Sequence, residues 1–260
     1  MMKFKSWVLG IGLLISNVAF SQTVQDGFRF LDRHQPSRAK QVFDGLVASA
    51  PTGENYFNLG LYYLHLRDWD NAKASFEKGK AADPKNYLNP VGLASILVGQ
   101  NNVSAAKVEF DKIIADTKSK NIDVLYRIAE AYSMYYILGK EESFNANNND
   151  PGEAIRLIDV IQERMLKDKK LPAPEHYIVK GDAFLIKNDG GDAVTAYEAA
   201  IAQDPRNVKA KVKIGTVYLR GKNYKETQAR YKEALDLDSN YAPGHRRYGE
   251  YLIIGGQYKN

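Results

Sequence analysis

The sequence predicts an all-α protein built from stacked pairs of antiparallel helices. Two observations support this: a small residue recurs at intervals close to 34 residues, and a large apolar residue follows it three positions later. The small residues are Gly27, Gly60, Ala94, Ala129, Gly181, Gly215 and Gly249. The large residues are Phe30, Tyr63, Leu97, Tyr132, Phe184, Tyr218 and Leu252. Seven occurrences of one spacing indicate a repeat protein whose units stack on their neighbours.

The small residues lie in the first helix of each unit. In the segment 54–66 the apolar residues are too dense for a single surface stripe, which is typical of a helix packed on several sides. We expect Gly60 and its equivalents to let the two helices of a unit approach closely.

A second helix follows in each of the first six units. Another small residue stands twelve positions after the first, and an aromatic residue four positions later, at Phe43, Phe76, Phe110, Tyr197 and Tyr231. In the fourth unit the same pattern continues after an insertion, at Ala154 and Ile158. We expect each aromatic ring to fill the gap beside the small residue of the first helix. Pro84 and Pro205 end the second helix in two units, because proline cannot continue a helix.

This set of offsets resembles the tetratricopeptide repeat (TPR) family, whose 34-residue unit is a pair of antiparallel helices. The resemblance covers residues 23–260 and implies a right-handed α-solenoid. In such proteins the first helices line a concave face that binds extended peptides or partner helices. The units are expected at about 22–52, 53–86, 87–121, 122–173 with insertions, 174–207, 208–241 and 242–260, the last one incomplete.

The first 21 residues have the pattern of a secretory signal peptide. Lys3 and Lys5 precede an apolar run from Trp7 to Phe20, and the small residues Ala19 and Ser21 fit a signal-peptidase site. The run is too short for a membrane span. The sequence therefore predicts cleavage after Ser21 and export, most simply to a periplasm, with an extracellular location as the alternative and no transmembrane segment in the mature chain.

Composition excludes several functional classes. The chain has no cysteine, which excludes disulfide scaffolds, thiolate metal sites and cysteine nucleophiles. The four histidines show no His-Glu-x-x-His spacing, and no glycine-rich phosphate loop occurs. The chain has no long run of Lys and Arg, so the sequence gives no indication of nucleic acid as a partner. The sequence thus predicts a protein that is not an enzyme, with no catalytic residue, no metal site and no cofactor.

Two irregularities interrupt the repeats. An insertion spans roughly residues 135–150 of the fourth unit, and insertions in repeat proteins often serve binding. Tyr132, Tyr135 and Tyr136 would share one side of a lengthened helix, either as a binding stripe or, as we favour, packed on the facing helix. The seventh unit has no second helix, so we expect a longer protein or self-association to cover its first helix.

Candidate partner-binding residues lie on the first helices. The position three before the small residue is apolar in successive units, including Phe57, Val91, Tyr126, Ile178 and Val212. Four carboxylates are expected on the same groove face, at Asp123, Glu130, Glu175 and Asp182. An apolar floor with an acidic centre favours a basic amphipathic segment. The alternative, left open, is that the apolar set packs between adjacent helices and the acids are merely solvated.

The sequence as a whole predicts a non-catalytic protein-interaction scaffold of the cell envelope. Its partner would be a peptide or helix of another envelope protein, bound on the concave face. The alternatives are an N-terminal module of a longer envelope protein with a peptidoglycan- or membrane-associated domain, and an accessory domain of an enzyme.

Overall fold

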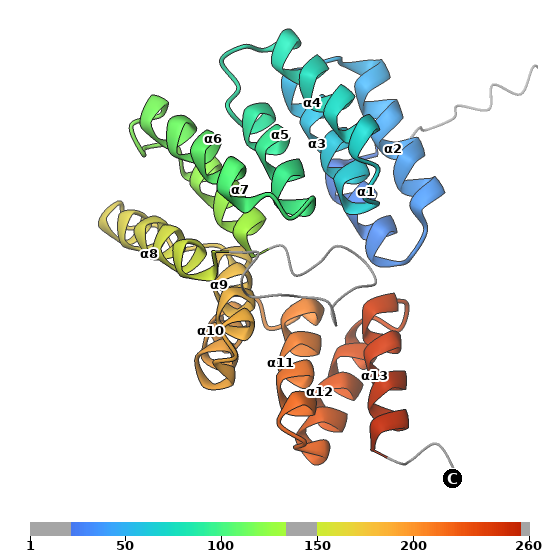
Figure 1. Cartoon of the computed structure of the whole chain (residues 1–260). Helices are drawn as coiled ribbons and strands as arrows, with labels where there is room; N and C mark the ends of the chain where they lie inside the picture. The colour runs from blue at the N-terminus through green and yellow to red at the C-terminus, as the bar shows by residue number, and fades with distance from the viewer. Residues whose placement is uncertain (1–21, 134–149, 256–260) are drawn as a thin grey trace, which may run out of the picture.

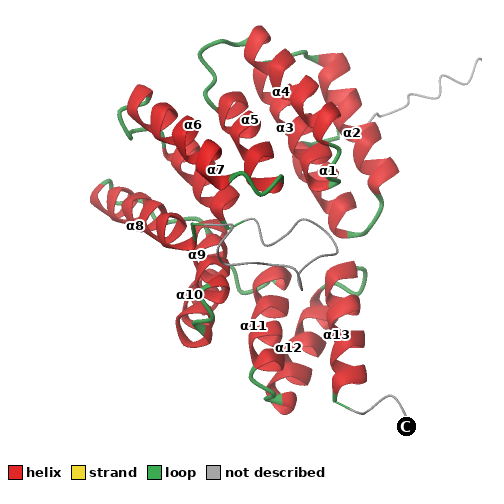
Figure 2. Ribbon diagram, in the orientation of Figure 1, coloured by secondary structure: helices red, strands yellow, loops and turns green. Residues whose placement is uncertain are grey.

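The computed structural model describes residues 22–133 and 150–255, and all regular structure in these ranges is helical (Figure 2). The helices of the described residues are α1 (Val24–Asp32), α2 (Pro36–Ser49), α3 (Gly53–His65), α4 (Trp69–Ala82), α5 (Leu88–Gly99), α6 (Val103–Asp116), α7 (Ile122–Tyr132), α8 (Pro151–Lys167), α9 (Pro174–Ile186), α10 (Gly190–Gln203), α11 (Val208–Arg220), α12 (Tyr224–Leu237) and α13 (Ala242–Ile254). The predicted all-α solenoid of helix pairs is confirmed.

The helices pack as successive pairs that curl into an arc (Figure 1). Within pairs, α3 contacts α4, α9 contacts α10 and α11 contacts α12. Between pairs, the first helices contact one another, α3 with α5, α5 with α7 and α7 with α9. The curvature brings α13, at the red end of the chain, back towards α1 at the blue end. The first helices therefore line the inner, concave side of the arc.

The turn inside most pairs has one recurring backbone feature. The residue immediately before the N-cap of the second helix adopts a positive φ angle at His34, Arg67, Asn101, Asn188 and Lys222. In α4, α6 and α10 the N-cap side chain then accepts a hydrogen bond from the first turn, as Asp68 does from the backbone N–H of Asn71. One left-handed residue followed by a cap reverses the chain tightly enough for the two helices to pack together.

Small and aromatic residues interlock within the pairs as the spacing predicts. A Cβ atom added at Gly60 would lie 2.3 Å from the ring of Phe76, and one added at Gly215 would lie 2.5 Å from the ring of Tyr231. The Phe76 ring also touches Gly92 of the next pair, so a single ring fills the space left by two glycines. These rings are fully buried. The repeat spacing therefore reflects interlocking inside the core.

The last helix of the array is partly uncovered. A Cβ atom added at Gly249 meets nothing within 4 Å, unlike the equivalent glycines of earlier pairs. Ile253 and Ile254 are 65% and 59% exposed at the end of α13. The face of α13 that would receive a second helix has no cover among the described residues.

Some predicted features lie outside the described residues. These are the signal peptide at 1–21, nearly all of the insertion at about 135–150, and residues 256–260. Tyr135 and Tyr136 also fall there, whereas Tyr132 is buried with its ring 5.2 Å from that of Phe110. In the parts that the structure describes, every helix is too short or too polar to cross a membrane.

Candidate active surface on the concave face

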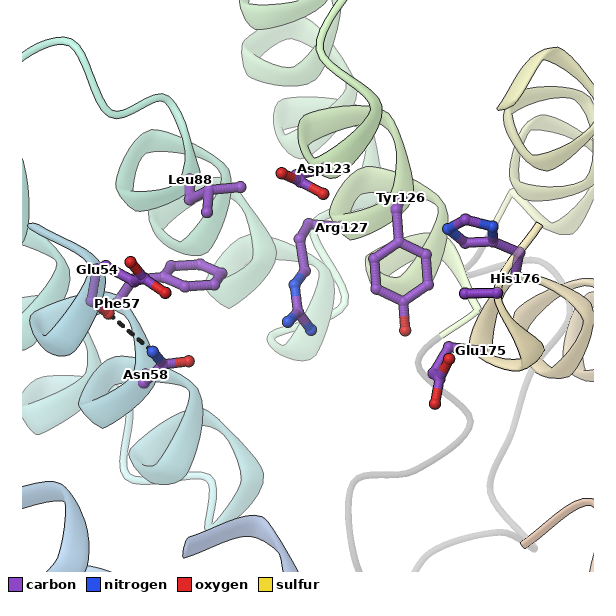
Figure 3. Close-up of a pocket in the computed structure, with 10 residues that line it drawn as sticks. Glu54, Phe57, Asn58, Leu88, Asp123, Tyr126, Arg127, Glu175 and His176 are labelled. Carbon is purple, nitrogen blue, oxygen red and sulfur yellow. Dashed lines mark hydrogen bonds between the residues drawn. The ribbon is translucent and has the colours of Figure 1, made fainter. Parts of the chain in front are cut away.

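A pocket opens on the concave side where the first helices of four units converge (Figure 3). Its volume is about 360 Å³. Helices α3, α5, α7 and α9 and the residue before α9 contribute its lining residues, which are Glu54, Phe57, Asn58, Leu88, Asp123, Tyr126, Arg127, Ala173, Glu175 and His176.

Helix α7 supplies the centre of the pocket. Asn121 caps this helix by accepting a hydrogen bond from the backbone N–H of Val124, which fixes where its first turn begins. Asp123, Tyr126 and Arg127 then stand at i, i+3 and i+4, so they share one face of the helix. The cap and the helical period together place these three side chains in the same opening.

Arg127 is held between two aromatic rings and one carboxylate. Its guanidinium lies 5.5 Å from the ring centre of Phe57 and 5.2 Å from that of Tyr126 (Figure 3). Its Nη1 donates to Glu130 at 2.7 Å. Burial by itself would raise the pKa of Glu130. The charge of Arg127 and its hydrogen bond to Glu130 outweigh this effect, so the pKa of Glu130 is lowered overall. Glu130 is therefore ionised at neutral pH, and the pair carries no net charge.

Tyr126 and His176 form the opposite wall. The Tyr126 hydroxyl donates to Glu130 at 3.2 Å, and its ring centre lies 5.3 Å from that of His176. Burial lowers the pKa of His176, so the imidazole is neutral at pH 7. The side chain is 7% exposed, and its Nδ1 is buried with no hydrogen-bond partner among the described residues. Buried polar atoms usually find a partner, so this nitrogen belongs to a small group of such atoms among the described residues.

Three further carboxylates surround the opening. Glu54, Asp123 and Glu175 are exposed, and none forms an ion pair with another described residue. With Arg127 and Glu130 cancelling one another and His176 neutral, the pocket carries three uncompensated negative charges. Leu88, Phe57 and Tyr126 add apolar surface beside them.

The structure brings together part of the predicted binding set. Phe57, Asp123, Tyr126 and Glu175 line one pocket, and Glu130 lies directly behind it through its bonds to Tyr126 and Arg127.

Four other members of the predicted set are placed elsewhere. Val91, Ile178 and Val212 are buried within the helix stack. Asp182 is 3% exposed and accepts hydrogen bonds from the Tyr197 hydroxyl at 2.6 Å and from Lys213 Nζ at 2.7 Å. The prediction that all four carboxylates lie on the open groove face is therefore wrong for Asp182, which is buried. The reason is that α11 brings a buried lysine against it.

Sequence reasoning missed six lining residues: Glu54, Asn58, Leu88, Arg127, Ala173 and His176. A usable signal existed for two of them. Arg127 follows Asp123 by four positions, and Glu54 precedes Phe57 by three, so each shares a helix face with a residue that was singled out. His176 had no such signal, because its role depends on how α9 packs against α7.

Comparisons with known proteins agree with the repeat assignment. Residues 53–86 and residues 178–242 each match a family model described as tetratricopeptide repeat. Tetratricopeptide repeat protein 1 of Schizosaccharomyces pombe is 31% identical over 81 residues, covering 31% of this chain and 8% of that protein. Tetratricopeptide repeat protein 21B of Mus musculus is 30% identical over 67 residues, covering 26% of this chain and 5% of that protein. This chain thus spans less than a tenth of the length of either curated relative.

Solved structures share the fold at low sequence identity. Yeast Tom70 superposes with a TM-score of 0.59 at 18% identity, over 90% of this chain and 46% of Tom70. A thermophilic TPR protein of Thermus thermophilus superposes with a TM-score of 0.59 at 17% identity, over 77% of this chain and 99% of that protein. A tetratricopeptide repeat protein of Parabacteroides merdae superposes with a TM-score of 0.57 at 13% identity, over 88% of this chain and 82% of that protein. The chain contains tetratricopeptide repeats and folds as a TPR solenoid.

Proposed function

We propose that this TPR array is a non-catalytic scaffold of the cell envelope that holds a partner peptide or helix on its concave face. The observation that carries the proposal is the pocket between α3, α5, α7 and α9. Four successive units contribute to it, so a segment lying along the concave face would contact several of them at once.

The character of the pocket favours binding over chemistry. Its one arginine donates to Glu130, and its one histidine packs against the Tyr126 ring at a tilted angle. In the parts of the chain that the structure describes, no group of three His, Cys, Asp or Glu side chains could hold a metal ion. These observations support a binding role for this opening.

The envelope location is proposed from the sequence of residues 1–21. Edman sequencing of the protein isolated from its native cells should begin at Gln22, and the protein should appear in the periplasmic or extracellular fraction. A chain that begins at Met1 and stays in the cytoplasmic fraction would refute the proposed location.

The scaffold role can be tested by site-specific photo-crosslinking in envelope extracts. A photoreactive residue at Glu54, inside the pocket, should capture one protein in a saturable manner. The same probe at Glu109, an exposed residue of the outer helix α6, should not capture it. Capture from position 54 should fall in a Glu175→Lys variant and persist in a Glu109→Lys variant. Equal capture at both positions would mean that the concave face is not the binding surface.

A second candidate function rests on α13. Its uncovered glycine face and exposed Ile253 and Ile254 suit a module that packs against a further domain or a second copy. Sedimentation of the purified protein tests the second copy. A concentration-dependent dimer that Ile253→Asp dissociates would support it, and a monomer at all concentrations would leave only the further domain.

A further inference from the structure

The chemistry of the pocket identifies the kind of group that it receives, and this inference rests on the proposed function. We infer that the pocket between α3, α5, α7 and α9 takes one basic side chain, arginine or lysine, from an extended segment of the partner protein. The argument comes from charge, from apolar surface and from an unsatisfied buried nitrogen.

Charge gives the first step. Glu54, Asp123 and Glu175 approach the opening from three different helices, α3, α7 and α9, and none is paired with a described cation. Each carboxylate is exposed when the pocket is empty. A cation entering between them gains attraction from three directions and relieves their mutual repulsion.

The arginine in the pocket does not reverse this preference. Arg127 already donates to Glu130 at 2.7 Å, and its guanidinium lies over the rings of Phe57 and Tyr126. An acidic ligand would have to compete with Glu130 for Arg127 while approaching three uncompensated carboxylates. The arrangement therefore discriminates against acidic segments as well as favouring basic ones.

Apolar surface gives the second step. Leu88, at the first turn of α5, and Tyr126 are partly exposed and line the same opening, whereas the Phe57 ring lies beneath Arg127 and is 2% exposed (Figure 3). Lysine and arginine have long methylene stems that lie along apolar surface while the charged end stays in a polar environment. The pocket offers both parts of that requirement within one cavity of about 360 Å³.

His176 gives the third and independent step. Its side chain is more than nine-tenths buried at the pocket wall, and its Nδ1 has no partner among the described residues. Figure 3 shows the imidazole beside Tyr126 and facing the lined opening. A neutral imidazole offers one acceptor nitrogen, and a bound ammonium or guanidinium brings several N–H donors into this corner.

A metal ion does not explain the same features. In the described ranges, no set of three His, Cys, Asp or Glu side chains lies close enough to hold one. The carboxylates surround a cavity wide enough for a side chain and do not converge on one point, so an organic cation fits better than a bare ion.

The test uses blocked pentapeptides of the form Ala-Ala-X-Ala-Ala, titrated into the purified full chain and followed by the NMR signals of the His176 and Tyr126 rings. Peptides with X as arginine or lysine should shift these signals saturably. Citrulline has nearly the shape of arginine but no charge, and its peptide should bind at least tenfold more weakly. The glutamate peptide should produce no shift.

Matched variants locate the interaction. Glu54→Gln, Asp123→Asn and Glu175→Gln should each weaken the arginine peptide about threefold, which is typical for loss of one solvated charge. The triple variant should weaken it more than tenfold, whereas Glu109→Gln on α6 should change nothing. Arg127→Gln should tighten arginine binding, because it removes the one cation among the lining residues and leaves Glu130 without that partner. Circular dichroism confirms that each variant is folded.

Several results would overturn the inference: equal binding of the arginine and citrulline peptides, tighter binding of the glutamate peptide, no binding of any peptide, or an unchanged triple variant. The crosslinking experiment separates this from the scaffold role. If position 54 captures a partner while the arginine peptide does not bind, the scaffold stands and only the basic anchor is wrong. If the peptide binds but no partner is captured, the scaffold role is wrong.

Discussion

Arg33 and Asp238 form an ion pair that links the two ends of the array. Nη2 of Arg33, directly after α1, lies 3.5 Å from Oδ2 of Asp238, the C-cap of α12. Nearby, burial raises the pKa of the Asp32 carboxyl, while the charges of Lys209 and Lys213 on α11 oppose that shift. Charged side chains from opposite ends of the sequence therefore meet where the curvature of the stack brings α1 back to its last units.

Neutralising Asp238 should loosen this contact. Because the chain contains no cysteine, Ser37→Cys and Ser239→Cys can carry a pair of spin labels without interference. Asp238→Asn should broaden the distance distribution between the labels, as should high salt, because ions screen exposed pairs. The free energy of unfolding should change by only about 0–1 kcal/mol. Asp236→Asn, an exposed neighbour on α12, is the control. Matching distributions for the Asp238→Asn protein and its parent would show that the pair does not hold the ends.

Two glycines at equivalent repeat positions should respond oppositely to alanine. At Gly60 a Cβ would overlap the Phe76 ring, so Gly60→Ala should lower the free energy of unfolding by about 1–3 kcal/mol through overpacking. At Gly249 a Cβ meets nothing, so Gly249→Ala should be neutral or stabilise by up to about 1 kcal/mol, because alanine favours the helix. Urea denaturation of both variants measures the difference. Equal effects would argue against interlocking as the reason for the small residue.

The buried pair of Asp182 and Lys213 should show strong coupling. Oδ1 of Asp182 and Nζ of Lys213 are 2.7 Å apart and almost fully enclosed, and burial raises the pKa of Asp182 to about 8 while lowering that of Lys213. Asp182→Leu or Lys213→Met alone should cost about 3–5 kcal/mol, since each leaves a buried ionisable group without this partner. The double variant should cost much less than the sum of the two. Thermodynamic additivity in the cycle would contradict the pairing, and the exposed pair Lys40–Asp44 serves as the weakly coupled control.

His65 should make the protein sensitive to mild acid. Burial, with Lys209 and His34 nearby, lowers its pKa from 6.5 to about 4, against a weaker opposing effect of Glu130. Between these values the unfolded state binds a proton that the folded state does not, so stability falls as the pH is lowered. Between pH 7 and pH 5 the loss should be about 2 kcal/mol. His65→Gln should remove that part of the pH dependence. An unchanged slope in the variant would mean that His65 titrates normally in the folded protein.

The pocket illustrates what the repeat register can and cannot predict. The register identified Phe57, Asp123, Tyr126 and Glu175, because each lies at a fixed offset from the small residue of its own first helix. It could not separate Phe57 and Tyr126 from Val91, Ile178 or Val212, which occupy the same offset but do not line the pocket. Whether such a position is open depends on how closely the neighbouring first helix approaches.

By itself, the sequence determined the helices, their pairing and the interlocking of Gly60 with Phe76. Those features follow from residue spacings within one unit or between adjacent units. The tertiary structure decided that Asp182 pairs with Lys213, that Arg127 contacts Glu130 and two rings, and that Arg33 reaches Asp238. The most distant of these contacts depends on the small rotation between units, which accumulates along the stack and is not encoded by any single repeat.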